Sequence, residues 1–166
     1  MSPQQTTAEQ DIGTQVTVKI NGGDVTVDEG DTILTACTQA GIDTPTICYA
    51  ENLTPVNACR VCVVEVEGNR TLVPSCSRPA EAGMVISTDS DRVKHSRKMV
   101  LEFLGTANDL SEAPQINEWS TEYGVDITRY AVGAERFDQP VKIQDNLYIR
   151  DYDKCVLCYK CVDACG

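Results

Sequence analysis

Aromatic residues, histidine and long apolar runs are scarce in this sequence, and each shortage excludes a class of protein. Only 5% of the 166 residues are aromatic, and there is a single histidine. No apolar run approaches the ~18 residues that a transmembrane helix needs, so we expect no membrane span. The first residues, MSPQQTTAEQDIGT, lack the basic and then apolar pattern of a secretory signal. Residues 1–13 are expected to form a flexible tail.

Positive charge is also scarce. The sequence has 14 Lys and Arg against 25 Asp and Glu, a formal net charge of −11. Nucleic acids and anionic membranes would repel such a protein, so neither is an expected partner. The acidic residues are spread along the chain, as on a solvated surface. No nucleophile–base pair and no glycine-rich phosphate loop is visible, so we identify no substrate-transforming site.

Cysteine, in contrast, is abundant. There are nine cysteines, and eight of them fall into two clusters. In a reducing compartment such clusters are more often metal ligands or redox groups than disulfides. We therefore expect a cytoplasmic protein that binds metal or iron–sulfur groups.

The first half has the pattern of an α+β domain. Residues 16–30 alternate apolar and polar positions around Asn21-Gly22-Gly23, which is a strong hairpin signal. Residues 31–41 read as a helix that Asp31 can cap and Gly41 can end. Two strand-like runs follow, and their sequences are RVCVVEVEG and TLVPS. Cys37 falls on the apolar face of the helix and is expected to be buried rather than a ligand.

Four cysteines between and after these elements could form one site. Cys48, Cys59, Cys62 and Cys76 follow the spacing C-x10-C-x2-C-x13-C. Four thiolates suit either zinc or an iron–sulfur cluster. Structural zinc usually uses two C-x2-C pairs, whereas one pair with two single cysteines is typical of [2Fe–2S] proteins. The spacing therefore favours a [2Fe–2S] cluster over zinc.

The stretch TILTACTQAGIDTPTICYAENLTPVNACRVCVVEVEGNRTLVPSC resembles a known iron–sulfur family. Its members include the large iron–sulfur subunit of complex I, the diaphorase iron–sulfur subunits of hydrogenases, and NAD-linked formate dehydrogenases. The resemblance covers about residues 16–85 and implies a β-grasp, ferredoxin-like fold with the four cysteines as ligands. It also implies two partners: a flavin- and NAD(H)-binding iron–sulfur subunit, and a catalytic domain or subunit. Asn57 stands where these proteins commonly have glycine, a change that a left-handed backbone tolerates.

The middle of the chain departs from this family. Relatives carry a [4Fe–4S] cluster there, held by one histidine and three cysteines, but this sequence has no cysteine between Cys76 and Cys155. Residues 90–109 read as a helix, and His95 lies early in it. The family's histidine position falls near Asn108. We therefore expect His95 to be a solvated residue and the histidine-ligated cluster to be absent.

The connector to the last cysteines is less informative. Residues 114–124 predict a second helix with Ile116, Trp119 and Tyr123 on one face. A short strand is expected within LYIRDYD. The resulting division places the β-grasp domain at 14–90, a helical connector at 91–140 and an incomplete ferredoxin-like module at 141–166.

The chain ends on KCVLCYKCVDACG, whose C-x2-C-x2-C-x3-C spacing is that of bacterial [4Fe–4S] ferredoxins. In this pattern Cys155, Cys158 and Cys161 hold one [4Fe–4S] cluster and Cys165 ligates a second. The missing fourth ligand predicts that the polypeptide continues past Gly166. Three alternatives stay open: Cys165 completes a single local cluster, another chain supplies a cysteine, or the motif is a zinc knuckle.

These sites predict an electron-transfer protein. Our main hypothesis is an iron–sulfur subunit or segment of a multi-subunit NAD(H)-linked oxidoreductase of the formate dehydrogenase or hydrogenase type. A complex I subunit is a further possibility by resemblance. A free-standing ferredoxin-type carrier is the alternative from another class, and the incomplete second site disfavours it.

Overall fold

The alternating residues after the N-terminal stretch form the expected hairpin. The structure is a computed structural model that describes residues 14–134, 139–144 and 146–166. Strands β1 (Gln15–Ile20) and β2 (Gly23–Asp28) pair antiparallel in full register. The turn between them places Asn21 at φ 49° and Gly22 at φ 90°. Two successive positive φ angles are what a tight two-residue hairpin requires, and Asn-Gly provides them at low cost.

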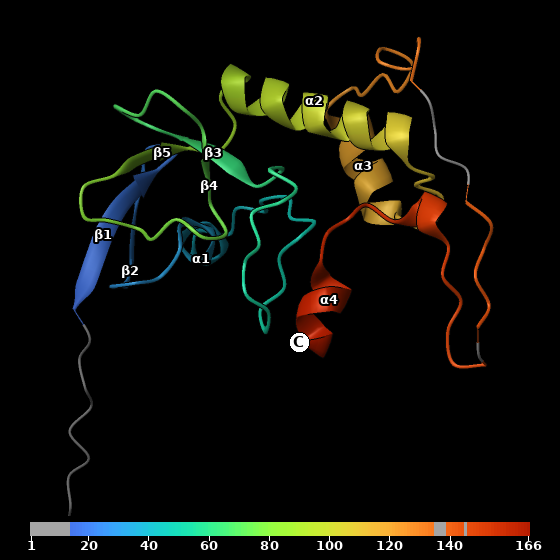
Figure 1. Cartoon of the computed structure of the whole chain (residues 1–166). Coiled ribbons are helices and arrows are strands. Elements are labelled where there is room, and N and C mark those ends of the chain that lie inside the picture. The colour runs from blue at the N-terminus through green and yellow to red at the C-terminus, as the bar shows by residue number, and fades with distance from the viewer. Residues whose placement is uncertain (1–13, 135–138, 145) are drawn as a thin grey trace, which may run out of the picture.

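Three further strands complete one mixed sheet, shown at the left of Figure 1. They are β3 (Val63–Val66), β4 (Val73–Pro74) and β5 (Val85–Ser87). The spatial order is β2-β1-β5-β3-β4, with β5 parallel to β1 and antiparallel to β3. This is the strand order of a β-grasp fold, so the expected fold class is confirmed. The central strand β5 was not predicted, because three residues carry too little pattern to detect.

Helix α1 (Ile33–Gln39) packs across the sheet. Its residues Ile33, Ala36 and Cys37 are fully buried in the main core with side chains of β1, β2, β3 and β5. The prediction that Cys37 is a buried apolar residue is confirmed. The predicted N-cap was wrong by one residue, because Thr32 accepts the hydrogen bond from the Thr35 backbone N–H. Asp31 instead accepts a hydrogen bond from the Asp28 backbone N–H.

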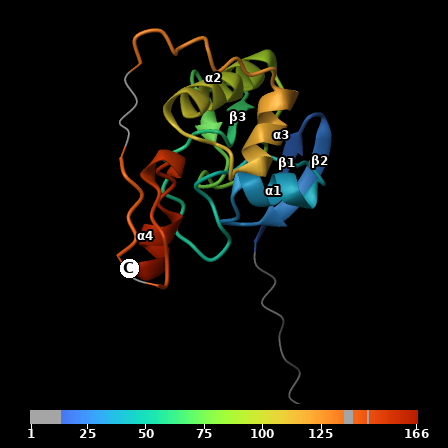
Figure 2. The ribbon, with the colours of Figure 1, turned by 90° about the vertical axis from the view of Figure 1, so that its right-hand side faces the viewer.

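Two helices follow the sheet and build a second core. They are α2 (Asp91–Ala107), which Ser90 caps, and α3 (Pro114–Glu122), which begins on proline as expected. Leu101 of α2 is buried against Ile116 and Trp119 of α3, together with Ile47 and Val61 from the loop before β3. Figures 1 and 2 show α2 lying along one end of the sheet with α3 beneath it. The predicted assignment of Trp119 to the core is confirmed.

Helix α2 also buries two charged residues that its apolar pattern did not reveal. Arg97 is 3% exposed and donates hydrogen bonds to the Tyr123 hydroxyl and to the Val63 carbonyl of β3. Glu102 is fully buried and accepts hydrogen bonds from the Arg129 guanidinium and the Asp126 backbone N–H. These contacts hold α2 to the sheet on one side and to the segment after α3 on the other.

The C-terminal segment is less regular than expected. The predicted strand at 147–153 is wrong: Arg150 forms a single bridge with Lys142, and a 3₁₀ turn, η1 (Tyr152–Lys154), follows. No described residues beside this bridge pair with each other, so the bridge does not extend into a strand. Helix α4 (Lys160–Cys165) ends the chain. The predicted tail and residues 135–138 of the connector lie outside the described residues.

No helix in the described part of the chain combines the length and apolar character needed to cross a bilayer.

Candidate iron–sulfur sites

The first cysteine group is assembled by the long irregular segment between α1 and β3. Cys48, Cys59 and Cys62 lie in this segment, and Cys76 follows β4 closely. Cys48, Cys62 and Cys76 are buried, and Cys59 is half-buried. The segment is irregular, yet both of its ends are anchored, because Ile47 and Val61 insert into the core that α2 and α3 share. Cys59 packs against this core, whereas Cys62 and Cys76 pack with Leu34 of α1.

Within this group the thiols form two pairs. The Cys76 side chain is the largest influence on the Cys62 thiol and lowers its pKa to about 6. The same contact, together with burial, raises the pKa of Cys76. The pKa of Cys62 is also lowered by the side chain and backbone N–H of Ser75. One thiolate of this pair is thus stabilised before any metal is bound.

The second pair joins Cys59 to Cys48. Burial is the largest influence on Cys59 and raises its pKa. Backbone N–H groups of Val61, Cys48 and Ile47 act against burial by donating to its sulfur. Amide donors that converge on a cysteine sulfur are the contacts that stabilise thiolate ligands of iron–sulfur clusters.

Two pairs suit a two-iron cluster better than a single zinc ion. Each iron of a [2Fe–2S] cluster takes two thiolates, whereas a structural zinc ion needs four ligands around one point. The pairing of Cys62 with Cys76 and of Cys59 with Cys48 therefore matches the donor set of [2Fe–2S].

The second cysteine group lies on the C-terminal loop and helix. Cys155 and Cys158 are half-buried in the loop, while Cys161 and Cys165 are exposed on α4. Leu157 and Tyr159 adopt left-handed φ angles of 52° and 64°, which turn the loop sharply around Cys158. No three of these thiols, all within the described residues, are placed to hold a single metal ion. The thiolates of a [4Fe–4S] cluster surround the whole cluster, one on each iron, and so lie farther apart than the ligands of one ion.

Hydrogen bonds fix this loop to the end of α2. The Asn108 side chain donates to the Cys155 carbonyl at 2.6 Å, and the Asp109 backbone N–H donates to the Asp153 carbonyl at 2.8 Å. Lys154 forms an ion pair with Asp109 at 2.8 Å, which lowers the pKa of Asp109 to about 2. The second cysteine group is thus held against the helix that carries the shared core.

The two cysteine groups are neighbours in space. Cys59 of the first and Cys158 of the second both pack against the core formed by α2 and α3. The Thr54 backbone N–H donates to the Asp163 carboxylate of α4 at 2.9 Å, although 109 residues separate them. Figure 1 shows α4 beside the loop of the first group. The two groups therefore border the same set of apolar side chains.

Comparison with known proteins identifies the family of the first group. Residues 13–91 match the family model described as a 2Fe-2S iron-sulfur cluster binding domain. This part of the chain is similar to that family. The 2Fe-2S domain therefore includes all four cysteines of the first group and the whole five-stranded sheet.

Longer proteins resemble nearly the whole chain. The NADP-reducing hydrogenase subunit HndD of Solidesulfovibrio fructosivorans is 38% identical over 91% of this chain and 28% of its own length. An NADH-quinone oxidoreductase subunit of Rhizobium meliloti is 32% identical over 90% of this chain and 18% of its own length. The NADPH-Fe(3+) oxidoreductase subunit alpha of Geobacter sulfurreducens is 30% identical over 89% of this chain. This chain spans less than a third of each of these relatives.

A solved structure shares the fold. The crystal structure of an NAD+-reducing [NiFe]-hydrogenase in the H2-reduced state superposes with a TM-score of 0.74 at 23% identity. The match covers 90% of this chain and 65% of that chain. The similarity therefore extends past the 2Fe-2S domain to the helices and the segment that follows them.

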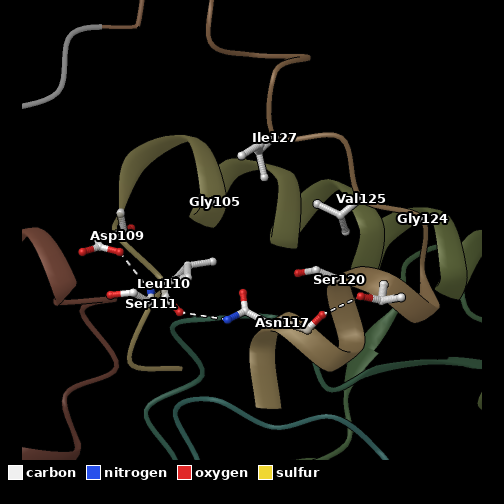
Figure 3. Close-up of a pocket in the computed structure, with 11 residues that line it drawn as sticks. Gly105, Asp109, Leu110, Ser111, Asn117, Ser120, Gly124, Val125 and Ile127 are labelled. Carbon is white, nitrogen blue, oxygen red and sulfur yellow. Dashed lines mark hydrogen bonds between the residues drawn. The ribbon is translucent and has the colours of Figure 1, made fainter. Parts of the chain in front are cut away.

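The region where relatives were expected to carry a histidine-ligated cluster holds a hollow without thiols. A pocket of about 680 Å³ lies between the C-terminal half of α2 and α3. Its lining is made of Gly105, Asn108, Asp109, Leu110, Ser111, Asn117, Ser120, Thr121, Gly124, Val125 and Ile127. Figure 3 shows their hydroxyl, amide and carboxylate groups held by local hydrogen bonds, such as Asn117 to the Leu110 carbonyl. No lining side chain offers sulfur or imidazole.

His95 lies away from both cysteine groups, exposed near the start of α2. We expect His95→Ala to leave the iron content of the protein unchanged and the free energy of unfolding within about 0.5 kcal/mol. Iron and sulfide analysis of the purified variant checks this. A loss of iron would show that His95 is a ligand after all.

Proposed function

We propose that this chain carries electrons within an NAD(P)H-linked oxidoreductase, with a cluster in its 2Fe-2S domain as one of the electron carriers. In this proposal Cys48 and Cys59 hold one iron of a [2Fe–2S] cluster, and Cys62 and Cys76 hold the other. The observation that carries it is the division of four thiols, three buried and one half-buried, into two pairs inside the region that matches a 2Fe-2S domain. Such a cluster accepts and releases single electrons and needs no further catalytic group.

A second electron-carrying cluster is proposed at the C-terminal motif. Cys155, Cys158 and Cys161 would hold a [4Fe–4S] cluster, and Cys165 would serve a second cluster of the same kind. The left-handed turns at Leu157 and Tyr159 support this assignment, since they let three closely spaced cysteines face one side of the loop. Cys59 and Cys158 pack against the same core of apolar side chains, which would then lie beside both clusters.

The relatives suggest the kind of enzyme. Two of them are named as NADP-reducing hydrogenase and NADPH-Fe(3+) oxidoreductase subunits, and a third as an NADH-quinone oxidoreductase subunit. We propose a hydrogenase-type or formate dehydrogenase-type assembly in which a flavin- and NAD(P)H-binding subunit exchanges electrons with this chain. A domain division at residues 14–90, 91–140 and 141–166 would place one electron-carrying cluster in the first part and the other in the last part. All nine cysteines are free of disulfides, as a cytoplasmic location would keep them.

The experiment is nucleotide-driven reduction of the natural protein with the subunits that copurify with it. Under anaerobic conditions, NADH or NADPH should produce the EPR signal of a reduced two-iron cluster. Dithionite serves as the control that the clusters are intact. Reduction by dithionite but by neither nucleotide would contradict the NAD(P)H link and favour a free-standing ferredoxin-type carrier.

A further inference from the structure

Asn57 contacts a cysteine of the first group with its side chain. Its Oδ1 lies 2.7 Å from the Ser77 hydroxyl oxygen and 3.5 Å from the Cys76 sulfur. The residue has a φ of 56°, and its side chain is half-buried. Asn57 lies in no strand or helix. Its side-chain amide is held instead by its contacts with Cys76 and Ser77, two adjacent residues of the loop that faces it.

The present direction of these hydrogen bonds depends on a protonated Cys76. A thiol can donate to the amide oxygen, and Ser77 donates to the same oxygen. A cysteine that ligates iron has lost its proton and can only accept. An amide oxygen facing a thiolate sulfur at 3.5 Å would then be repelled, because both atoms carry negative charge.

A half-turn of the amide removes this conflict without moving the backbone. It exchanges Oδ1 for Nδ2, which carries two hydrogens, at nearly the same position. One hydrogen then points to the Cys76 sulfur and the other to the Ser77 hydroxyl. Ser77 can switch from donor to acceptor because a hydroxyl does both. One nitrogen thus satisfies both partners that the oxygen contacts now.

We propose that Asn57 donates a hydrogen bond from its side-chain amide to the Cys76 sulfur when the first cysteine group holds its cluster, and thereby raises the reduction potential of that cluster. The inference rests on the proposed [2Fe–2S] ligation by Cys76. A reduced cluster carries one more negative charge than an oxidised one, so a donor to a ligand sulfur stabilises the reduced state more. Asn57 is a positioning and tuning residue, because it acts through Cys76.

Asn57→Gly tests this with little risk to the fold. Glycine adopts a φ of 56° more readily than asparagine does, so the loop can keep its course while the amide is lost. We expect a lower midpoint potential in an EPR-monitored redox titration of the natural protein. The expected change is about tenfold in the ratio of reduced to oxidised cluster at fixed potential, or about 59 mV for a one-electron couple.

Asn21→Gly is the matched control. It makes the same chemical change at another left-handed asparagine, φ 49°, whose side chain forms its hydrogen bonds within the described residues with Thr88 and contacts no cysteine there. Its potential should equal that of the wild type. An intact two-iron signal with an unchanged potential in Asn57→Gly would overturn the proposal while leaving the ligand assignment in place. Absence of the two-iron signal from wild-type protein would instead overturn the ligand assignment.

A second measurement covers the case in which Asn57→Gly fails to take up iron. Wild-type protein is produced with asparagine labelled with ¹⁵N in the side-chain amide, and its reduced cluster is studied by pulsed EPR. A hydrogen-bonded Nδ2 at Cys76 should give a ¹⁵N coupling, because the hydrogen bond shares spin density with the donor. Lack of a side-chain ¹⁵N coupling would overturn the proposal.

Discussion

Replacing Cys62 by serine should abolish the first cluster. Cys62 is 2% exposed and its thiolate is the one that the structure stabilises most, through the Cys76 thiol and through Ser75. A serine hydroxyl ionises far less readily than a thiol and cannot supply this anion. The variant of the natural protein should lose about two irons per chain, and the EPR signal of the reduced two-iron cluster should disappear. Iron analysis and EPR spectroscopy measure both.

Loss of the first cluster should also lower the stability of the protein. The loop from α1 to β3 lacks regular hydrogen bonding, so a bound cluster would contribute much of its order. The unfolding temperature of Cys62→Ser should therefore fall toward that of iron-free protein. A two-iron signal that survives in Cys62→Ser, or one zinc and no iron in the wild type, would contradict the assignment.

Cys37→Ala separates ligand loss from the loss of a buried sulfur. Cys37 is fully buried in the main core, on the α1 face that contacts the sheet. Its substitution should cost about 1 kcal/mol in the free energy of unfolding through lost packing. Iron content should stay at the wild-type value, since no cluster ligand is removed.

Local signals made much of this fold predictable. Asn21 and Gly22 specify the hairpin because few other pairs accept two successive positive φ angles. Helix α3 begins at Pro114 and ends before Gly124, as proline and glycine at those places require. The first cysteine group stood out because its four cysteines lie at characteristic spacings in one loop and just past the next hairpin.

Features that depend on contacts between distant segments were not predictable. The burial of Arg97 and Glu102 could not be read from the helix pattern, because their partners come from β3 and from residues 123–129. Strand β5 is short and takes its place through its pairing with β1 and β3. The contact between Asn57 and Cys76 joins two loops, and no spacing along the chain encodes it.

We expect the C-terminal cysteines to have different roles, because they hold different places in the loop and on α4. Cys161 lies in the first turn of the helix and Cys165 lies four residues later, on its last turn. Four helical residues correspond to a rise of about 6 Å. Cys155 and Cys158 come from the loop that precedes the helix, so Cys165 is the member farthest along the chain from that loop. The Asp163 bond to Thr54 fixes the direction of α4 beside the first cysteine group.

In the natural protein, Cys158→Ala and Cys165→Ala should therefore perturb different clusters. Cys158→Ala should remove a corner ligand of the cluster that Cys155 and Cys161 share, and its signal should vanish from the reduced EPR spectrum. Cys165→Ala should leave that signal in place and alter a second one, as crossed ligation in two-cluster ferredoxins predicts. Both variants should keep the two-iron signal, since the four cysteines of the first group are untouched. Loss of one and the same four-iron signal in both variants would show that all four thiols bind a single local cluster.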